Sequence, residues 1–225
     1  MAYRRTERVV RRLAARHDAI LAAAQSAAAE GGMAAVQIAP VAERAGIAAG
    51  TVYRYFPSKT DLVNDLVAQA CTQDVEVMRQ AAEAAPGPLS AIAAAVVAFG
   101  ERALANRKLA WALIAEPVDT ATEAARLGFR RALAAELDRL IRAAAAAGLL
   151  APEPNPGLTA AALVGALLEG LIGPLAPDVE ASPARRREAV QSLTLLVLRA
   201  LGLADARARG LVVQTALPAL SEGAA

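Results

Sequence analysis

The sequence predicts an all-α fold. More than a quarter of the 225 residues are alanine, which has the best helix propensity, while aromatic residues make up only 3%. Apolar residues recur at helical spacing along most of the chain, and no alternating pattern typical of a strand stands out. Glycine and proline interrupt these stretches at intervals. The composition therefore argues against an all-β fold and favours a series of helices.

The first helix is expected over residues 8–30, where Val9, Leu13, Ile20 and Leu21 fall on one stripe and Gly31 and Gly32 supply the stop. Ser58 is a good N-cap for the fourth helix because Asp61 follows three residues later, close to the capping-box pattern. The other helices are expected over residues 39–45, 49–56, 58–84, 89–105, 107–115, 120–147, 157–171, 184–202 and 204–217.

Several classes of protein are disfavoured by composition. The single cysteine, Cys71, excludes an internal disulfide framework and a multi-cysteine zinc site. The single histidine, His17, has no serine or cysteine dyad near it, so no catalytic residue, metal or cofactor is expected. The best candidate for a membrane span, residues 154–177, contains Glu169 and several glycines and prolines. A cytoplasmic protein without a membrane partner is therefore expected.

Basic charge is concentrated at the N-terminus, although the whole chain has a net charge of only +2. Residues 1–17 contain six arginines and a single acidic residue, Glu7. A basic arm beside a recognition helix is a common means of gripping the DNA backbone or minor groove. The alternative is that this stretch is a solvated tail.

Residues 41–56 have the spacing of a helix-turn-helix. Val41 and Ala45 share one face of a short helix, and Gly46 follows where a tight turn needs an uncrowded backbone. Val52 and Phe56 again share a face, which we expect to be directed back at the first helix. The same pattern also occurs as ordinary packing between helices, so spacing alone does not establish DNA binding.

The opposite face of the second helix is polar, aromatic and cationic. With Val52 and Phe56 directed inward, this face is centred on Gly50 and Arg54. The hydroxyl groups of Thr51, Tyr53 and Tyr55 can donate hydrogen bonds to phosphate oxygens. Arg54 can reach a phosphate or a guanine edge. Lys59, at the start of the next helix, is a further candidate for binding phosphate because a helix N-terminus favours an anion.

These residues resemble the TetR family of bacterial transcription regulators, over roughly residues 8–70. The resemblance is carried by the run from Val41 to Ile47, the run from Gly50 to Lys59, and Asp61 and Leu62. It implies a homodimeric repressor whose C-terminal helical body binds a small molecule and whose N-terminal heads bind adjacent major grooves. The domains it implies are residues 1–60, a three-helix DNA-binding domain with the basic arm, and residues 61–225, a helical effector-binding and dimerisation domain.

The DNA-binding residues are carried over position by position. The residues that match DNA-contacting positions of the family are Gly50, Thr51, Tyr53, Tyr55 and Lys59. Arg54 matches a variable position. Gln37 stands where the family usually has the Ser or Thr that caps the second helix and touches a phosphate, and Ala48 and Ala49 replace polar residues of the turn. The predicted set is Gln37, Gly50, Thr51, Tyr53, Arg54, Tyr55 and Lys59.

Two long helices near the C-terminus are apolar on more than one side, which requires burial on more than one side. A pair of such helices from each of two chains would form a four-helix dimer interface, whereas the alternative is burial within a monomeric core. The predicted interface residues are Leu163, Leu167, Leu171, Leu193, Leu196, Val197 and Leu201.

The central helices would surround a pocket for a small-molecule effector. Such pockets are mostly apolar with a few placed polar groups, although each candidate could equally be ordinary packing or a solvated charge. The candidates are Met78, Phe99, Arg102, Trp111, Glu116, Arg126 and Phe129.

The favoured hypothesis is a dimeric transcriptional repressor that a ligand releases from a palindromic double-stranded DNA operator, by shifting the helix over residues 58–84. The first alternative is an all-helical protein-interaction module without DNA binding. The second is a cofactor-free enzyme, for which no acid/base constellation is visible.

Overall fold

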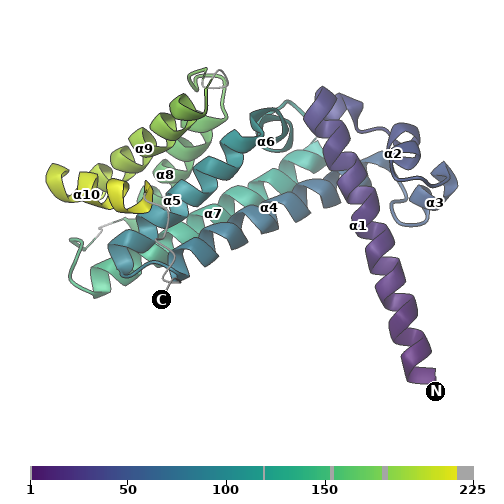
Figure 1. The fold of residues 1–225 in the computed structure, drawn as a ribbon, viewed down its shortest axis with the longest axis horizontal. Helices are drawn as coiled ribbons and strands as arrows, with labels where there is room; N and C mark the ends of the chain where they lie inside the picture. The colour runs from purple at the N-terminus through teal and green to yellow at the C-terminus, as the bar shows by residue number, and fades with distance from the viewer. Residues whose placement is uncertain (1, 119, 153–154, 179–181, 217–225) are drawn as a thin grey trace, which may run out of the picture. The chain divides into compact units, whose positions relative to one another are not determined.

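The structure is a computed structural model that describes residues 2–118, 120–152, 155–178 and 182–216. The predicted all-α fold is confirmed, since the described residues form ten helices and their connections (Figure 1). The helices are α1 (Ala2–Ala35), α2 (Ile38–Arg44), α3 (Ala49–Tyr53), α4 (Lys59–Glu83), α5 (Pro88–Ala105), α6 (Arg107–Ile114), α7 (Thr120–Ala146), α8 (Pro156–Leu171), α9 (Pro183–Ala200) and α10 (Asp205–Ala216).

Most boundaries lie within two residues of those expected, but α3 ends at Tyr53 rather than at residue 56. A larger difference is found in α1. It begins at Ala2 rather than at residue 8, and it continues to Ala35 across a break in its backbone. The break falls at the two glycines that were expected to stop the helix: Gly31 has φ −133° and ψ 20°, and Gly32 has φ 70° and ψ −170°. Residue 217, the last of the expected tenth helix, and residue 1 lie outside the described residues.

The chain divides into two compact units. The first contains the residues up to Ala70 together with Lys108–Leu127, and the second contains Cys71–Arg107 and the residues from Gly128 onward. Helices α4 and α7 therefore have one part in each unit. The first unit is larger than the expected DNA-binding domain, because α6 and the connection to α7 pack with the N-terminal helices.

The core of the first unit is formed by α1, α2, α3 and the beginning of α4. Ile20, Val41 and Leu62 are fully buried in it, and α3 contributes Val52. Phe56, just beyond α3, is only 1% exposed. The expected inward orientation of Val52 and Phe56 is therefore confirmed.

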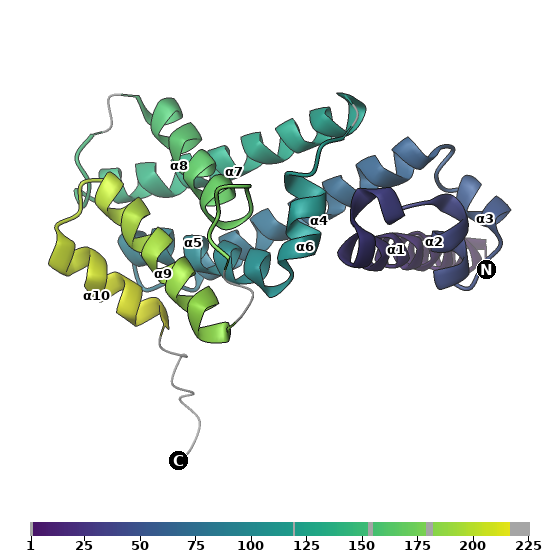
Figure 2. The ribbon, with the colours of Figure 1, turned by 90° about the horizontal axis from the view of Figure 1, so that it is seen from above.

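The core of the second unit is organised around α5, which packs against α8, α9 and α10 (Figure 2). By length and composition α5 could cross a membrane. However, its side chains Ile92, Val96 and Phe99 are buried in the core of the unit. Because buried core helices also meet the length and composition criterion, this apolar character is accounted for by packing.

We expect Phe56→Ala to destabilise the first unit by about 3–5 kcal/mol, because the substitution leaves a cavity beneath α3. Chemical denaturation followed by circular dichroism measures this change. Tyr53→Ala is the matched control, since the Tyr53 side chain is 52% exposed and its removal should change stability by less than about 1 kcal/mol. Equal destabilisation by both substitutions would contradict this description of α3.

Candidate nucleic-acid interface

The turn between α2 and α3 has the backbone that the sequence predicts. Gly46 has a φ of 66°, a left-handed conformation that favours glycine. The Ile47 amide donates to the Ala42 carbonyl at 2.9 Å and the Gly46 amide to the Glu43 carbonyl at 3.0 Å, which closes the end of α2. The half-buried Ile47 side chain then fills the corner. This turn sets the direction in which α3 leaves α2.

Side-chain contacts hold α2 against the end of α1. Arg44 donates two hydrogen bonds of 2.6 Å to the two carboxylate oxygens of Glu30. These bonds hold the pKa of the Glu30 carboxyl below its usual value. Gln37 precedes α2 but does not cap it through its side chain, and its Nε2 instead donates to the Ala34 carbonyl at 2.9 Å.

The outer face of α3 is open to solvent. Gly50, Tyr53 and Arg54 are exposed on it, and Thr51 and Tyr55 are half-buried at its edges. A Cβ added at Gly50 would meet no atom within 4 Å, and the φ of Gly50 is not positive. Nothing within the described protein therefore requires glycine at this position, whereas close approach by an external partner would.

The start of α4 adds a cation beside this face. The predicted capping arrangement is confirmed, because the Asp61 amide donates to the Ser58 Oγ at 3.1 Å and the Ser58 amide donates to an Asp61 carboxylate oxygen at 3.0 Å. Lys59 is the first residue of α4 and is exposed. A phosphate would be favoured here by the Lys59 charge and by the helix N-terminus together.

His17 lies where α1 enters the core of the first unit. Its ring centroid is 5.0 Å from that of Phe56 and 6.5 Å from that of Tyr55. Its Nε2 is 3.5 Å from an Asp65 carboxylate oxygen. No group of three or more His, Cys, Asp or Glu side chains suited to a metal ion occurs among the described residues.

The seven effector candidates are divided between the two units. Met78, Phe99 and Phe129 are buried, and Trp111 is partly buried. Arg102 forms a hydrogen-bonded ion pair with Asp74, whose pKa is raised because burial outweighs the opposing effect of Arg102. None of the seven lines the grooves described below.

Arg126 and Glu116, the remaining two candidates, have structural roles in the first unit. Arg126 is 2% exposed and donates to the carbonyls of Ala112, at 2.6 Å, Leu113, at 2.8 Å, and Glu116. It thereby satisfies carbonyls at the end of α6 that have no partner within the helix.

The Glu116 carboxylate is bonded to the break in α1. It accepts a hydrogen bond of 2.9 Å from the Met33 amide, the first amide after the break. A Cβ at Gly32 would lie 2.8 Å from the same carboxylate, and the φ of Gly32 is 70°. Glu116 therefore fixes the turn of α1 that leads into α2. Sequence patterns did not indicate this contact because it joins residues 83 positions apart.

The predicted interface residues separate into two groups. Leu163, Leu167, Leu171 and Val197 are buried within the second unit, so they do not lie on a surface open to another chain. Leu196 is 52% exposed, and Leu193 and Leu201 are partly exposed. The reason for the difference is that α8 and α9 are apolar on two sides, and the periodicity does not indicate which side packs inside the protomer.

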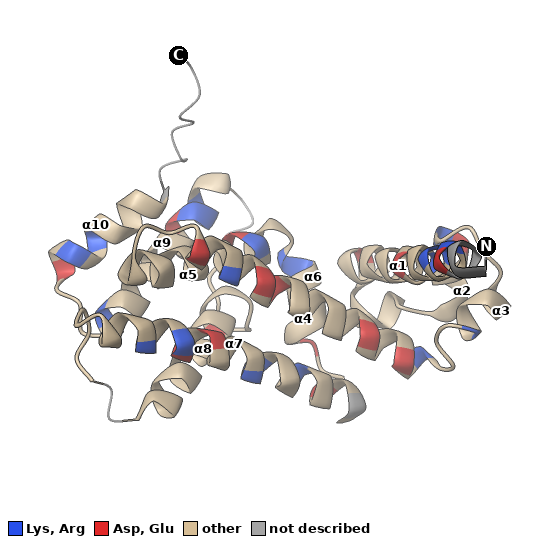
Figure 3. Ribbon diagram, turned by 90° about the horizontal axis from the view of Figure 1, so that it is seen from below, with Lys and Arg blue, Asp and Glu red and all other residues tan. Residues whose placement is uncertain are grey.

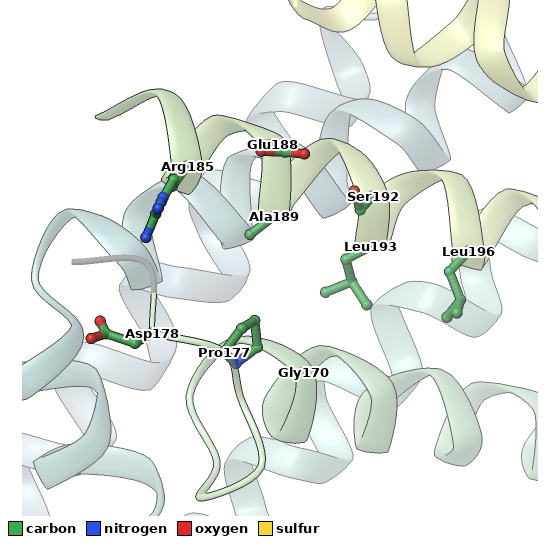
Figure 4. Close-up of a pocket in the computed structure, with 9 residues that line it drawn as sticks. All are labelled: Gly170, Pro177, Asp178, Arg185, Glu188, Ala189, Ser192, Leu193 and Leu196. Atoms are coloured by element: carbon green, nitrogen blue, oxygen red, sulfur yellow. The ribbon is translucent and has the colours of Figure 1, made fainter. Parts of the chain in front are cut away.

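Two grooves open on the surface formed by α7, α8 and α9. One, between α8 and α9, has a volume of about 540 Å³ and is lined by Leu193, Leu196, Ser192 and Gly170 among others (Figure 4). The other, between α7 and α8, has a volume of about 440 Å³. The exposed Ala161 and Gly165 line this second groove. These small residues were not among the predicted interface residues, although their spacing of four places them on one helix face.

Comparison with known proteins identifies the helix-turn-helix. Residues 20–66 match the family of bacterial regulatory proteins, tetR family. The chain is 50% identical over 54 residues to the HTH-type transcriptional repressor KstR of Rhodococcus jostii (strain RHA1). These matched residues make up 24% of this chain and 26% of KstR. The chain thus matches about a quarter of the length of its curated relatives.

Solved structures extend the similarity to most of the chain. FadR, a fatty acid degradation regulator from Bacillus halodurans, aligns with a TM-score of 0.70 over 81% of this chain and 94% of FadR, at 22% identity. RolR in complex with resorcinol aligns with a TM-score of 0.64 over 94% of this chain and all of RolR, at 19% identity. These similarities show that the fold of the two units is shared.

We expect Glu116→Ala to increase hydrogen exchange of the Met33 amide and to destabilise the first unit by about 1–3 kcal/mol, because a partly buried donor loses its acceptor. Amide exchange measured by NMR, together with chemical denaturation, tests both effects. Glu116→Gln keeps an acceptor oxygen and should restore most of the protection. If Met33 exchanges at the same rate in all three proteins, the contact does not fix the end of α1.

Proposed function

We propose that the chain is a dimeric, sequence-specific transcriptional repressor, because its residues 20–66 match the family of bacterial regulatory proteins, tetR family. A small-molecule ligand would release it from a palindromic operator. The observation that carries this proposal is the disposition of α3: its inner side is buried through Val52, and its outer side, with Tyr53 and Arg54, is open.

The chemistry of this open side supports DNA as the partner. Tyr53, Tyr55 and Thr51 can donate hydrogen bonds to phosphate oxygens, and Arg54 can bind a phosphate or a guanine edge. The glycine at position 50 would allow the α3 backbone to approach the duplex closely. The matched relatives in this segment are repressors, which supports repression and a non-enzymatic role. Binding to chromosomal operators also implies a cytoplasmic location.

The outer side of α8 and α9 supports a homodimer. One groove is lined mainly by α9, and the other lies between α7 and α8. The second groove includes the small residues Ala161 and Gly165, which allow a second helix to approach closely. A two-fold arrangement would place the same face of the partner subunit against these grooves. The interface would then centre on Leu193 and Leu196, while the buried leucines of α8 support it from inside.

A small-molecule effector is supported by the shared fold. RolR, which has the same architecture, binds resorcinol in its structure. The second unit is the natural location because its helices α5, α7 and α8 enclose a core of apolar residues. Met78, Phe99 and Phe129 lie in that core, and a ligand would have to displace or separate such side chains, which couples binding to helix movement.

We expect Tyr53→Ala and Lys59→Ala each to weaken operator binding about tenfold or more, because each removes a phosphate contact. A mobility shift with DNA from upstream of the gene, repeated across salt concentrations, is the measurement. Lys108→Ala is the matched control, since Lys59 and Lys108 are the two lysines of the chain and Lys108 is exposed on α6. A protein-interaction module would instead show weak nucleic-acid binding with little salt dependence in every variant.

We expect Leu196→Glu to convert the dimer to a monomer, because it places a charge in an apolar contact between subunits. Light scattering after size-exclusion chromatography measures the mass in solution. Val213→Glu on α10 serves as the control, since Val213 is similarly exposed, at 60%. A dimer that persists in Leu196→Glu would show that the subunits meet elsewhere.

A further inference from the structure

The first part of α1 forms a helical arm that stands clear of the rest of the first unit. We define the arm as residues 2–16. Among the described side chains of α1, the first that is buried is Ile20, and residues 7–16 are all exposed. Figure 1 shows this part of the helix extending past α2 and α3. The arm is a continuous extension of α1, and its described side chains, residues 7–16, lie outside the hydrophobic core.

Basic side chains occupy one side of the arm. At about 100° per residue, Arg8, Arg11, Arg12 and Arg16 fall within an arc of about 140°. Basic residues are visible near the N-terminal end of α1 in Figure 3. Arg11 pairs with Glu7 at 3.1 Å, and Glu7 is the only acidic residue of the arm.

Three further arginines of the arm have no carboxylate partner among the described residues. Arg8, Arg12 and Arg16 form no ion pair with any residue that the structure describes. By contrast, arginines in the second unit such as Arg102 and Arg142 pair with carboxylates. Arg8, Arg12 and Arg16 are also spaced four apart, so that their like charges destabilise the helix that carries them. A polyanionic partner would remove this repulsion.

The root of the arm lies next to the segment that directly follows α3. His17, the residue directly after the arm, has its ring 6.5 Å from that of Tyr55 and 5.0 Å from that of Phe56. Tyr55 belongs to the set that we propose contacts DNA. A duplex bound at α3 would therefore lie close to the base of the arm. As a helix of 15 residues the arm is about 22 Å long, which corresponds to about six base pairs.

We propose that the arm is a second, sequence-independent DNA contact, in which its arginines bind backbone phosphates of the duplex that flanks the site contacted by α3. This inference rests on the proposed function of the helix-turn-helix. An anionic membrane fits the arm less well, because Leu13 is the only Trp, Phe or Leu among the described side chains of the arm, and such residues form the apolar face of helices that lie on membranes.

The test uses the full chain and a random-sequence duplex of about 40 base pairs, since phosphate contacts do not depend on sequence. The arm variant combines Arg8→Gln, Arg12→Gln and Arg16→Gln. Its control combines Arg142→Gln, Arg207→Gln and Arg209→Gln, which removes the same charge from exposed positions of the second unit. The logarithm of the binding constant falls by about 0.9 per phosphate contact for each tenfold rise in salt.

The measured quantity is the slope of the logarithm of the binding constant against the logarithm of the salt concentration. We expect the arm variant to reduce the magnitude of this slope by about 2–3 for each bound protomer, because three phosphate contacts are lost. The control variant should keep the slope of the parent chain. The arm variant should retain the melting temperature of the parent chain, because Arg8, Arg12 and Arg16 are exposed and form no ion pair with a described residue. An unchanged slope in the arm variant, with the parent chain still binding DNA, would overturn the arm proposal alone. Absence of salt-dependent DNA binding in the parent chain would overturn the proposed function as well.

Two further measurements separate the partners. With an operator located by mobility shift, trimming about six flanking base pairs from each side should weaken binding of the parent chain and leave the arm variant unaffected. Vesicles containing phosphatidylserine test the membrane alternative. One outcome would contradict the proposal: the parent chain binds vesicles, the arm variant does not, and both show the same salt dependence of DNA binding. That outcome would assign the arm to a membrane surface.

Discussion

The burial of Val52 and Phe56 beneath α3 is the interaction on which the candidate DNA-binding surface depends. A helix of five residues is not stable by itself in water, because too few hydrogen bonds offset the cost of ordering its first turn. Helix α3 exists because these two side chains are held in the core of the first unit, at 0% and 1% exposure. The same anchoring fixes the opposite side of the helix outward. The exposed position of Tyr53 and Arg54 is thus a consequence of packing on the other side.

The remaining contacts of the first unit restrict the orientation of this short helix. The left-handed backbone at Gly46 sets its direction relative to α2, and the pair between Arg44 and Glu30 holds α2 to α1. The bond from the Met33 amide to Glu116 then ties the end of α1 to the connection between α6 and α7. Helix α7 itself begins in the first unit and continues into the second, as α4 does.

Local patterns predicted most of the fold and much of the surface. Helical periodicity, proline and glycine placed ten helices near their observed bounds, and the spacing of Val52 and Phe56 predicted which side of α3 is buried. These features depend on residues close in the chain. The capping pair of Ser58 and Asp61 was predictable for the same reason.

Features that depend on distant residues were not predictable in this way. The contact of Glu116 with Met33 needs the folded chain, and so do the carbonyl partners of Arg126, which sequence patterns placed at an effector site. The division of α8 into a buried side, with Leu167, and an outer side, with Gly165, also requires knowledge of what each side packs against. Sequence alone could not separate two apolar sides of one helix.

Hydrogen–deuterium exchange of the full chain with and without operator DNA tests the central claim most directly. The account predicts that DNA slows exchange in the segment from the turn before α3 to the first turn of α4, residues 46–61, while the outer sides of α8 and α9 exchange as before. Unchanged exchange in that segment, or protection confined to the second unit, would contradict the assignment of α3 as the DNA-binding helix.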